Sequence, residues 1–429
     1  MSPFQALNLP NGQTIGNRIA KAAMEENLAD TGQAPSDALF RLYQAWAGGE
    51  AGLLLTGNVM IDRRAMTGPG GVVLEDERDM ERFRQWATIG RSGGAQFWVQ
   101  LNHPGRQTMA NLGQQAWAPS AVALDLGSFS KMFAEPKPMS EDDIAEVITR
   151  FATSAALAEK AGFTGVQIHA AHGYLISQFL SPLTNRRTDR WGGSLENRAR
   201  LLLDVISAVR QAVSPKFCVS VKLNSADFQR GGFDADDARQ VIQWLNDQPI
   251  DLLELSGGSY EAPAMQGEAR DGRTLAREAY FLEMAGELAS VARMPVMVTG
   301  GIRRLAIVEQ VLDSGIAMAG IGTALALEPQ LVKHWREGRN SHPQLPPIQW
   351  KRKPLAALAS MAVVKFQLQR LSRGRKPRPE VSAVWALILD RLYIGRRTRQ
   401  YRQAMGALNP PNYRPEKRSR DSCRKSPAR

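Results

Sequence analysis

Residues 165–174 read Gly-Val-Gln-Ile-His-Ala-Ala-His-Gly-Tyr, an apolar run that ends in a polar cluster. Segment 165–168 has the character of a short buried strand, and His169, His172 and Tyr174 follow where that strand should end. In parallel α/β architectures, functional side chains collect at the carboxyl ends of the strands. Two imidazoles and a phenol can converge there on one small oxygen atom, whereas paired loop histidines are often only solvated. These residues alone leave both interpretations open.

Seven further strand-like runs accompany this one, with helical segments between them. The eight runs cover residues 19–24, 52–60, 96–101, 165–169, 217–223, 251–255, 295–299 and 319–321. Apolar residues at helical spacing predict helices over 142–161, 195–213 and 235–246. Alternating strands and helices favour a parallel sheet, and eight repeats favour a closed (β/α)8 TIM barrel of the α/β class. A doubly wound sheet is a weaker alternative, because no Gly-x-Gly-x-x-Gly turn follows an early strand.

The two ends of the chain depart from the barrel pattern. Residues 7–15 alternate around an Asn-Gly turn, which predicts an N-terminal β-hairpin that acts as a lid on the bottom of the barrel. Beyond residue 345 the chain becomes rich in Arg and then in Pro and charge. We therefore expect three parts, which are a barrel over 1–345, a basic helical extension over 346–408 and a disordered tail over 409–429.

The positive net charge of +12 belongs to the C-terminal part of the chain. Residues 351–429 hold 21 of the 54 Lys and Arg residues but only 4 of the 42 Asp and Glu residues, which leaves 33 basic and 38 acidic residues in 1–350. We therefore expect no nucleic-acid partner for the barrel. Segments 354–371 and 381–405 are amphipathic and predict two helices. They can cover the barrel, form a homo-oligomer contact, or attract an anionic membrane surface or nucleic acid.

The number of cysteines limits the kinds of metal and disulfide sites that the chain can form, and the N-terminal sequence indicates its cellular location. Cys218 and Cys423 are the only thiols, so one chain cannot build a disulfide framework or a cysteine-ligated zinc or iron–sulfur site. No third ligand at convincing spacing accompanies His169 and His172, so we expect no metal site. The N-terminus lacks the pattern of a secretory signal, and no apolar run approaches the roughly 20 residues of a membrane span. These features predict a cytoplasmic protein without a transmembrane segment.

Three segments together resemble the old yellow enzyme family of FMN-dependent ene reductases. They are His-Ala-Ala-His-Gly-Tyr-Leu at 169–175, Gln-Phe-Leu-Ser-Pro at 178–182 and Gly-Gly-Ser-Leu-Glu-Asn-Arg at 192–198. Asn-Arg-Ile at 17–19 and Gln-Leu-Asn-His-Pro-Gly-Arg at 100–106 resemble the family's first and third strands, so the resemblance extends over about residues 3–340. It implies a single-domain NAD(P)H oxidoreductase on a (β/α)8 barrel. In such an enzyme, FMN at the strand ends is reduced by NADH or NADPH and passes hydride to a small activated alkene, such as an α,β-unsaturated carbonyl.

The resemblance also implies a role for each matching residue. His169 and His172 would bind the substrate by donating hydrogen bonds to its carbonyl oxygen, and Tyr174 would protonate its α-carbon. The positions that match the family's flavin-binding residues are Ala22, Ala23, Met24, Asn58, Gln100, Lys222, Gly300, Gly301, Gly322 and Thr323. Lys222 stands where the family usually has arginine, and it supplies a charge near flavin N1 without the bidentate fork. The last four positions would bind the phosphate.

Two positions depart from the family pattern. Thr323 replaces an arginine, so the phosphate loses a charge partner unless Arg303 or another residue substitutes. Glu25 stands where relatives often place Thr or Cys near flavin O4, and an ionised carboxylate cannot donate a hydrogen bond. Three alternatives follow for Glu25. Its carboxylate turns away from flavin O4, or the carboxylate is protonated, or its charge lowers the reduction potential of the flavin. Glu25 is also a candidate substrate contact, and the adjacent Glu26 is an alternative to it.

Two other functions are compatible with parts of the sequence. Lys222 at a strand end can form a Schiff base, which would make the protein a lyase with His169 and Tyr174 as acid and base. Alternatively, the barrel is a degenerate scaffold and the basic tail carries the function. Loop 257–277, which follows the sixth strand-like run, is expected to shape the pocket in either enzyme.

Overall fold

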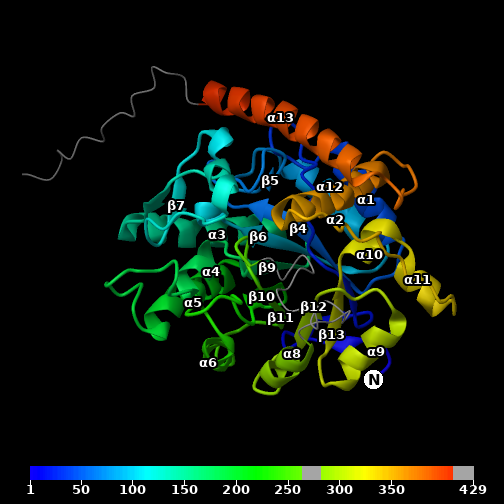
Figure 1. Ribbon diagram of the computed structural model, residues 1–429. Helices are drawn as coiled ribbons and strands as arrows, with labels where there is room; N and C mark the ends of the chain where they lie inside the picture. The colour runs from blue at the N-terminus through cyan, green and yellow to red at the C-terminus, as the bar shows by residue number, and fades with distance from the viewer. Residues whose placement is uncertain (263–281, 409–429) are drawn as a thin grey trace, which may run out of the picture.

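Eight parallel strands form a closed barrel in the computed structural model, which describes residues 1–262 and 282–408 (Figure 1). The strands are β3 (Ile19–Lys21), β4 (Leu53–Met60), β6 (Gln96–Asn102), β9 (Gly165–Ala170), β10 (Cys218–Asn224), β11 (Leu252–Ser256), β12 (Val296–Thr299) and β13 (Met318–Ile321). The pairing of β3 with both β13 and β4 closes the barrel, and β5 (Val72–Val73) adds to the end of β4. The predicted (β/α)8 fold is confirmed.

Seven of the eight predicted strands end within one residue of the observed ones, but the first was predicted too long. Strand β3 ends at Lys21 rather than at residue 24. The N–H of Ala22 still donates to Ile321 O, at 2.9 Å. Because β13 ends at Ile321, the next residues have no partner strand on that side, and the chain leaves the sheet at the barrel mouth.

Helices surround the barrel (Figure 1). They are α1 (Asp37–Ala47), α2 (Met80–Arg91), α3 (Glu141–Ala161), α4 (Leu175–Leu180), α5 (Leu195–Ala212), α6 (Ala235–Leu245), α8 (Leu282–Ala289), α9 (Leu305–Asp313), α10 (Thr323–Leu327) and α11 (Leu331–Arg336). Helix α3 shows how the sequence sets their bounds. A reciprocal cap between Ser140 and Asp143 begins it, and Gly162 with φ 92° ends it. Its apolar face, which includes Ile144 and Phe151, is buried in the core.

The N-terminal hairpin covers the amino ends of the barrel strands, as the sequence predicts. It consists of β1 (Leu7–Asn8) and β2 (Thr14–Ile15), which pair antiparallel. Its apolar side chains pack into the bottom of the barrel interior together with Trp98 and Cys218. The N–H of Asn11 donates to Asp251 Oδ1 at the start of β11, at 3.2 Å. The hairpin is therefore a plug for the end of the barrel that faces away from the histidines.

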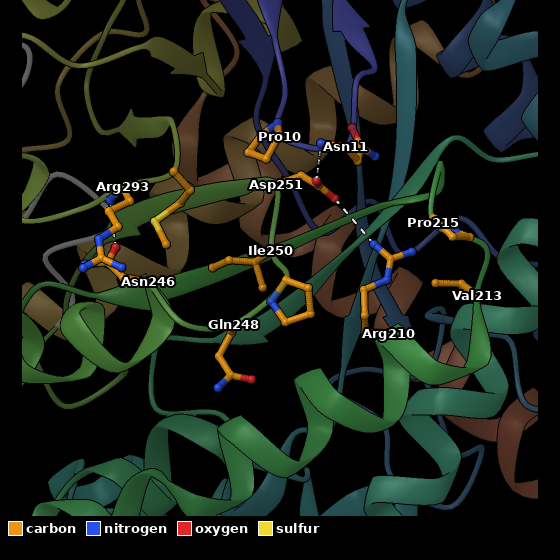
Figure 2. Close-up of a pocket in the computed structure, with 12 residues that line it drawn as sticks. Pro10, Asn11, Arg210, Val213, Pro215, Asn246, Gln248, Ile250, Asp251 and Arg293 are labelled. Atoms are coloured by element: carbon orange, nitrogen blue, oxygen red, sulfur yellow. Dashed lines mark hydrogen bonds and ion pairs between the residues drawn. The ribbon is translucent and has the colours of Figure 1, made fainter.

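A cavity of about 500 Å³ opens beside this hairpin (Figure 2). Asp251, the carboxylate in the wall of this cavity, already has protein partners. It also accepts from the Val219 N–H at 2.8 Å and lies 3.7 Å from the Arg210 guanidinium. The cavity lies at the amino ends of the strands, where polar contacts in TIM barrels serve stability rather than catalysis. We therefore place the functional site elsewhere.

The C-terminal extension forms two long helices that lie side by side against the barrel (Figure 1). They are α12 (Lys353–Leu371) and α13 (Ala383–Leu408), which lie where the two helices were predicted, although neither is amphipathic over its whole length. Helix α13 is attached to loops at the barrel mouth, because Tyr393 Oη donates to Asn27 O at 2.7 Å and Arg397 Nη2 donates to Ala29 O at 2.8 Å. The extension therefore covers its own barrel. The predicted disordered tail, 409–429, lies outside the described residues.

No helix within residues 1–262 and 282–408 combines the length and the apolar character needed to cross a membrane.

Tyr401 tests whether the extension stabilises the barrel. Its side chain is 1% exposed, packs with Met60 and Leu112, and donates to Arg63 O at 2.6 Å. We expect Tyr401→Phe to lower the free energy of unfolding by about 1 kcal/mol through the lost hydrogen bond. Tyr401→Ala should lower it by about 3 kcal/mol or more through the cavity that it leaves. Urea unfolding measures both changes.

The control is Arg402→Ala, which changes an exposed residue on the same helix and should alter stability by less than about 0.5 kcal/mol. A Tyr401→Ala protein as stable as this control would show that the extension does not support the barrel.

Candidate active site

Three predicted side chains converge at the carboxyl end of β9. The His169 ring centroid lies 5.0 Å from that of His172 and 4.9 Å from that of Tyr174, and both contacts are edge-on. The chain turns sharply there, because His172 and Gly173 both have left-handed backbone conformations, with φ of 60° and 72°. This turn returns Tyr174 to the side of the sheet on which His169 lies. The structure therefore brings the two imidazoles and the phenol together.

Both imidazoles are held in the neutral form. Burial, and secondly the charge of Lys222, lower the pKa of His169 and His172 well below the usual 6.5. His169 Nδ1 accepts the Ala171 N–H at 3.3 Å, so the single ring proton of His169 is on Nε2. His172 is positioned by Ser256, whose Oγ lies 2.7 Å from its Nε2. Each neutral ring carries one N–H donor, and that of His172 is free for a ligand when Ser256 donates to Nε2 and the ring proton is on Nδ1.

The Tyr174 hydroxyl is buried and has two polar neighbours. Asn58 Nδ2 donates to Tyr174 Oη at 3.4 Å, and Tyr260 Oη lies 3.1 Å from it. Burial, followed by the charge of Glu25, raises the pKa of Tyr174 above the usual value of 10. The phenol is therefore protonated at neutral pH and has a proton to donate.

A chain of buried polar side chains crosses four neighbouring strands beneath this cluster. Lys222 Nζ on β10 donates to Glu254 Oε1 on β11 at 2.7 Å, and both side chains are nearly inaccessible to solvent. Gln167 Nε2 donates to the other oxygen of Glu254 at 2.8 Å, and Gln100 Nε2 donates to Gln167 Oε1 at 2.7 Å. Two predicted flavin-binding residues, Lys222 and Gln100, thus belong to one hydrogen-bonded chain. The chain fixes where the Lys222 charge lies.

The remaining predicted cofactor positions lie across the barrel mouth from the histidines. Gly300 and Gly301 follow β12, and Gly322 and Thr323 follow β13, which is four strands from β9 in either direction. Ala22, Ala23 and Met24 follow β3, the neighbour of β13. The two sets of residues therefore face each other over the mouth of the barrel.

Several observations indicate that this mouth fits FMN. A Cβ added to Gly322 would meet only Met24 within 4 Å, at 3.9 Å, so the backbone there is open to a ligand. Among residues 1–262 and 282–408, the hydroxyl of Thr299, at the end of β12, is buried and has no hydrogen-bond partner, and it lies beside the predicted phosphate-binding glycines. Small side chains at 22 and 23 leave room for a flat ring. The residues present can therefore hold FMN, with its phosphate near β12 and β13.

The two glutamates after β3 point to different partners. Glu25 Oε1 accepts from Thr67 Oγ1 at 2.5 Å, and Glu25 Oε2 lies 3.6 Å from Lys365 Nζ in the C-terminal extension. These contacts, with Thr67 and with the extension, favour the first of the three alternatives for Glu25, in which its carboxylate turns away from the flavin position. Glu26 is buried and accepts from Tyr43 Oη at 2.5 Å. Glu26 is therefore a structural residue rather than the alternative substrate contact.

The ammonium group of Lys21 explains why Glu26 is tolerated in the core. Lys21 Nζ lies 3.6 Å from Glu26 Oε1 and donates to Leu55 O at 2.6 Å. Burial lowers the pKa of Lys21 to about 8, although Glu26 acts in the opposite direction. The buried carboxylate is thus paired and hydrogen-bonded, as a charge in a protein interior requires.

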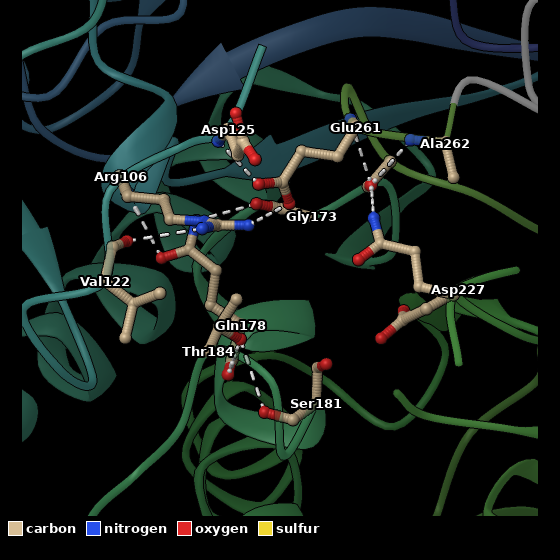
Figure 3. Close-up of polar contacts among 12 residues, drawn as sticks. Arg106, Val122, Asp125, Gly173, Gln178, Ser181, Thr184, Asp227, Glu261 and Ala262 are labelled. Carbon is tan, nitrogen blue, oxygen red and sulfur yellow. Dashed lines mark hydrogen bonds and ion pairs between the residues drawn. The ribbon is translucent and has the colours of Figure 1, made fainter. Parts of the chain in front are cut away.

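Sequence reasoning expected the loop after β11 to shape the pocket but did not single out the two residues in it that contact other site residues. Tyr260 in this loop contacts Tyr174, and the next residue, Glu261, forms an ion pair with Arg106 (Figure 3). Expected loop 257–277 does contribute to the pocket through residues 257–262, whereas its remaining residues lie outside those that the structure describes. Sequence reasoning also missed Glu254. The sequence does contain a signal for Glu254. It is the single acidic residue in the apolar run Leu-Leu-Glu-Leu, and the preceding strand-like run, Val-Lys-Leu, contains a single basic residue.

Replacing Glu254 tests the buried ion pair. Glu254→Gln leaves the Lys222 cation without a charge partner in the core, so we expect the free energy of unfolding to fall by about 3 kcal/mol. Urea unfolding measures the change. The double variant Lys222→Met with Glu254→Gln is the control and should recover most of this loss. If the single variant is as stable as the wild type, the pair does not hold a buried charge.

The described geometry has counterparts among known proteins. A family model described as the NADH:flavin oxidoreductase / NADH oxidase family matches residues 3–342. A NADH-dependent flavin oxidoreductase from Hypocrea jecorina is 36% identical over 349 residues, which cover 76% of this chain and 87% of that protein. A second one, from Neonectria sp., is also 36% identical, over 352 residues that cover 76% of this chain. The chain spans about half of this second relative, since the match covers 46% of it.

A solved structure agrees with these relatives. The old yellow enzyme homologue from Zymomonas mobilis is 25% identical and superposes with a TM-score of 0.69, over 83% of this chain and 99% of that one. The chain therefore belongs to the NADH:flavin oxidoreductase / NADH oxidase family and is an FMN-dependent oxidoreductase of the old yellow enzyme type.

Proposed function

We propose that the protein reduces an activated alkene, such as an α,β-unsaturated carbonyl compound, at the expense of NADH. The observation that carries this proposal is the convergence of His169, His172 and Tyr174 at one strand end. The two fungal relatives are named NADH-dependent, which supports NADH over NADPH as the reductant. FMN, when bound, would accept hydride from the nicotinamide and deliver it from N5 to the β-carbon of the alkene.

The two histidines would bind and polarise the substrate carbonyl. As neutral rings, they offer N–H donors to an oxygen that gains negative charge during the reaction, which is the arrangement of an oxyanion hole. A neutral donor suits this task because it does not give up its proton to the developing enolate. Their depressed pKa values therefore support a role in binding and polarisation rather than in proton transfer.

Tyr174 would complete the reduction by protonating the α-carbon. Its hydroxyl is protonated at neutral pH, and its oxygen already accepts a hydrogen bond from Asn58, which would stabilise the phenolate left behind. Lys222 and Gln100 would lie beneath the flavin ring, with Ala22, Ala23 and Met24 along it. The glycines after β12 and β13, with Thr323, would bind the phosphate.

Neither alternative function fits the site as well. A Schiff-base lyase needs Lys222 as a free nucleophile, whereas its Nζ is buried and donates to Glu254. A degenerate scaffold would not need the hydrogen bonds that orient His169, His172 and Tyr174. Membership of an oxidoreductase family also disfavours both alternatives.

The C-terminal extension supports one further part of the proposal. Helix α13 carries exposed apolar side chains on its outer face. Trp385 is 53% exposed to solvent and Leu392 is 66% exposed, and Val384 and Ile388 are exposed beside them. This apolar stripe supports the predicted homo-oligomer through the extension, because an exposed stripe of this kind favours association. The division of the chain after residue 345 and the cytoplasmic location stay predictions.

Tyr174→Phe tests the proton-donor role. The variant keeps the ring but has no proton to donate, so we expect reoxidation of the reduced enzyme by 2-cyclohexenone to slow by about 100-fold or more. Reduction by NADH should be largely unchanged, because that step needs no phenol. Anaerobic stopped-flow absorbance of the flavin measures both half-reactions.

Tyr401→Phe is the matched control, since it removes a phenol hydroxyl outside the site and should leave both rates unchanged. Equal slowing of the two half-reactions by Tyr174→Phe would contradict the proton-donor role.

A further inference from the structure

We propose that Tyr260 is a second proton-carrying residue that stabilises the Tyr174 phenolate and returns a proton to it after each turnover. This inference rests on the proposed alkene reduction and adds the step that regenerates its acid. It makes the pair of tyrosines, rather than Tyr174 alone, the proton-delivery unit of the site.

The geometry of the two phenols carries the inference. Their oxygen atoms lie 3.1 Å apart, which is within hydrogen-bond distance, and their ring centroids are 6.0 Å apart. Tyr174 is only 6% exposed, whereas Tyr260 is intermediate in exposure. Tyr260 is therefore the more accessible of the two tyrosines, which makes it the better placed to exchange a proton with solvent.

The hydrogen bonds around Tyr174 leave its proton available for the substrate. Asn58 Nδ2 donates to Tyr174 Oη, and either phenol can donate in the hydrogen bond between Tyr174 and Tyr260. When Tyr260 donates, Tyr174 keeps its own O–H for another acceptor. After that proton has left, both neighbours donate to the anionic oxygen. Hydrogen bonds to a charged oxygen are stronger than those to a neutral one, so the pair stabilises the phenolate more than the phenol.

Glu25 makes such stabilisation necessary. Its charge lies close enough to raise the pKa of both tyrosines, in each case in addition to burial. A phenolate at Tyr174 is therefore unfavourable and must be short-lived. Because burial, Tyr174 and Glu25 also raise the pKa of Tyr260 well above its usual value, Tyr260 must regain a proton as it gives one up.

The loop that carries Tyr260 is fixed by contacts on both sides of it. On one side, Asn224 Nδ2 donates to Gly258 O at 3.1 Å. On the other, Glu261 forms an ion pair with Arg106 and accepts the Asp125 N–H at 2.8 Å (Figure 3). Arg106 and Glu261 are thus positioning residues for Tyr260, since the ion pair attaches its loop to the segment after β6.

The proton balance closes with water as the proton source. The Tyr174 O–H bond breaks as a C–H bond forms at the α-carbon of the enolate, whose oxygen returns to a carbonyl. The Tyr260 O–H proton then moves to the Tyr174 oxygen as a new O–H bond forms at Tyr260 with a proton from water. Each turnover therefore consumes one solvent proton and leaves both phenols neutral.

Tyr260→Phe tests the inference. We expect reoxidation of the reduced holoenzyme by 2-cyclohexenone to slow by about 10- to 100-fold, the factor that corresponds to one hydrogen bond to a charged group. The rate of reduction by NADH, the flavin content and the KM for the enone should not change. Tyr393→Phe, which removes a phenol that bonds to Asn27 O, is the matched control and should behave as the wild type.

Two further variants separate a relay from a structural effect. In a Tyr174→Phe background, Tyr260→Phe should cause no additional slowing, because there is no phenolate to reprotonate. Glu261→Gln should slow reoxidation in the wild type but not in the Tyr260→Phe background, because Glu261 acts only through Tyr260. Both results are expected if Tyr260 affects the reaction only through Tyr174, because the effects of the substitutions are then not additive.

Three outcomes would overturn the inference. Wild-type rates in Tyr260→Phe, or an equal loss in the Tyr174→Phe background, would exclude the relay while leaving the proposed function intact. A wild-type enzyme that does not reduce the enone at all would overturn the proposed function, and the relay with it.

Discussion

The buried ion pair between Lys222 and Glu254 is the constraint on which the rest of the site depends. It places one cation beneath the barrel mouth and holds it there through Glu254, which also binds Gln167. Together with burial, that cation helps to keep His169 and His172 neutral, as the hydrogen-bond donor role proposed for them requires. The same charge is available to an anionic ring above it. One pair of residues thus affects the protonation of both imidazoles and the electrostatics of the proposed cofactor position.

The proposed proton donor is separated in space from this cation. Tyr174 lies at the same strand end as the histidines, but its hydroxyl turns to Asn58 and Tyr260. Burial and Glu25 keep it protonated, whereas burial and Lys222 keep the imidazoles from taking up a proton. Groups whose pKa values are displaced in opposite directions can divide acid and donor roles in one pocket. Lys365 extends this arrangement, because it pairs Glu25 with the C-terminal helices.

Much of the fold was predictable because it follows from local pattern. Eight apolar runs with helices between them indicate a barrel, and the cluster from His169 to Tyr174 stands at one strand end in the sequence itself. The end of β3 was not predictable, since it depends on where β13 stops, about 300 residues later. The partners of the site residues were harder still. Glu254, Tyr260 and Lys365 reach the site through pairings that only the closed barrel and its extension create, and no local spacing encodes them.

The most direct test of the account is an anaerobic spectroscopic titration of the purified protein, first with NADH and then with an enone such as 2-cyclohexenone. We predict a bound flavin whose visible absorbance is bleached by NADH and restored by the enone without oxygen. A protein that binds no flavin, or a reduced flavin that the enone fails to reoxidise, would contradict the assignment of His169, His172 and Tyr174 to alkene reduction.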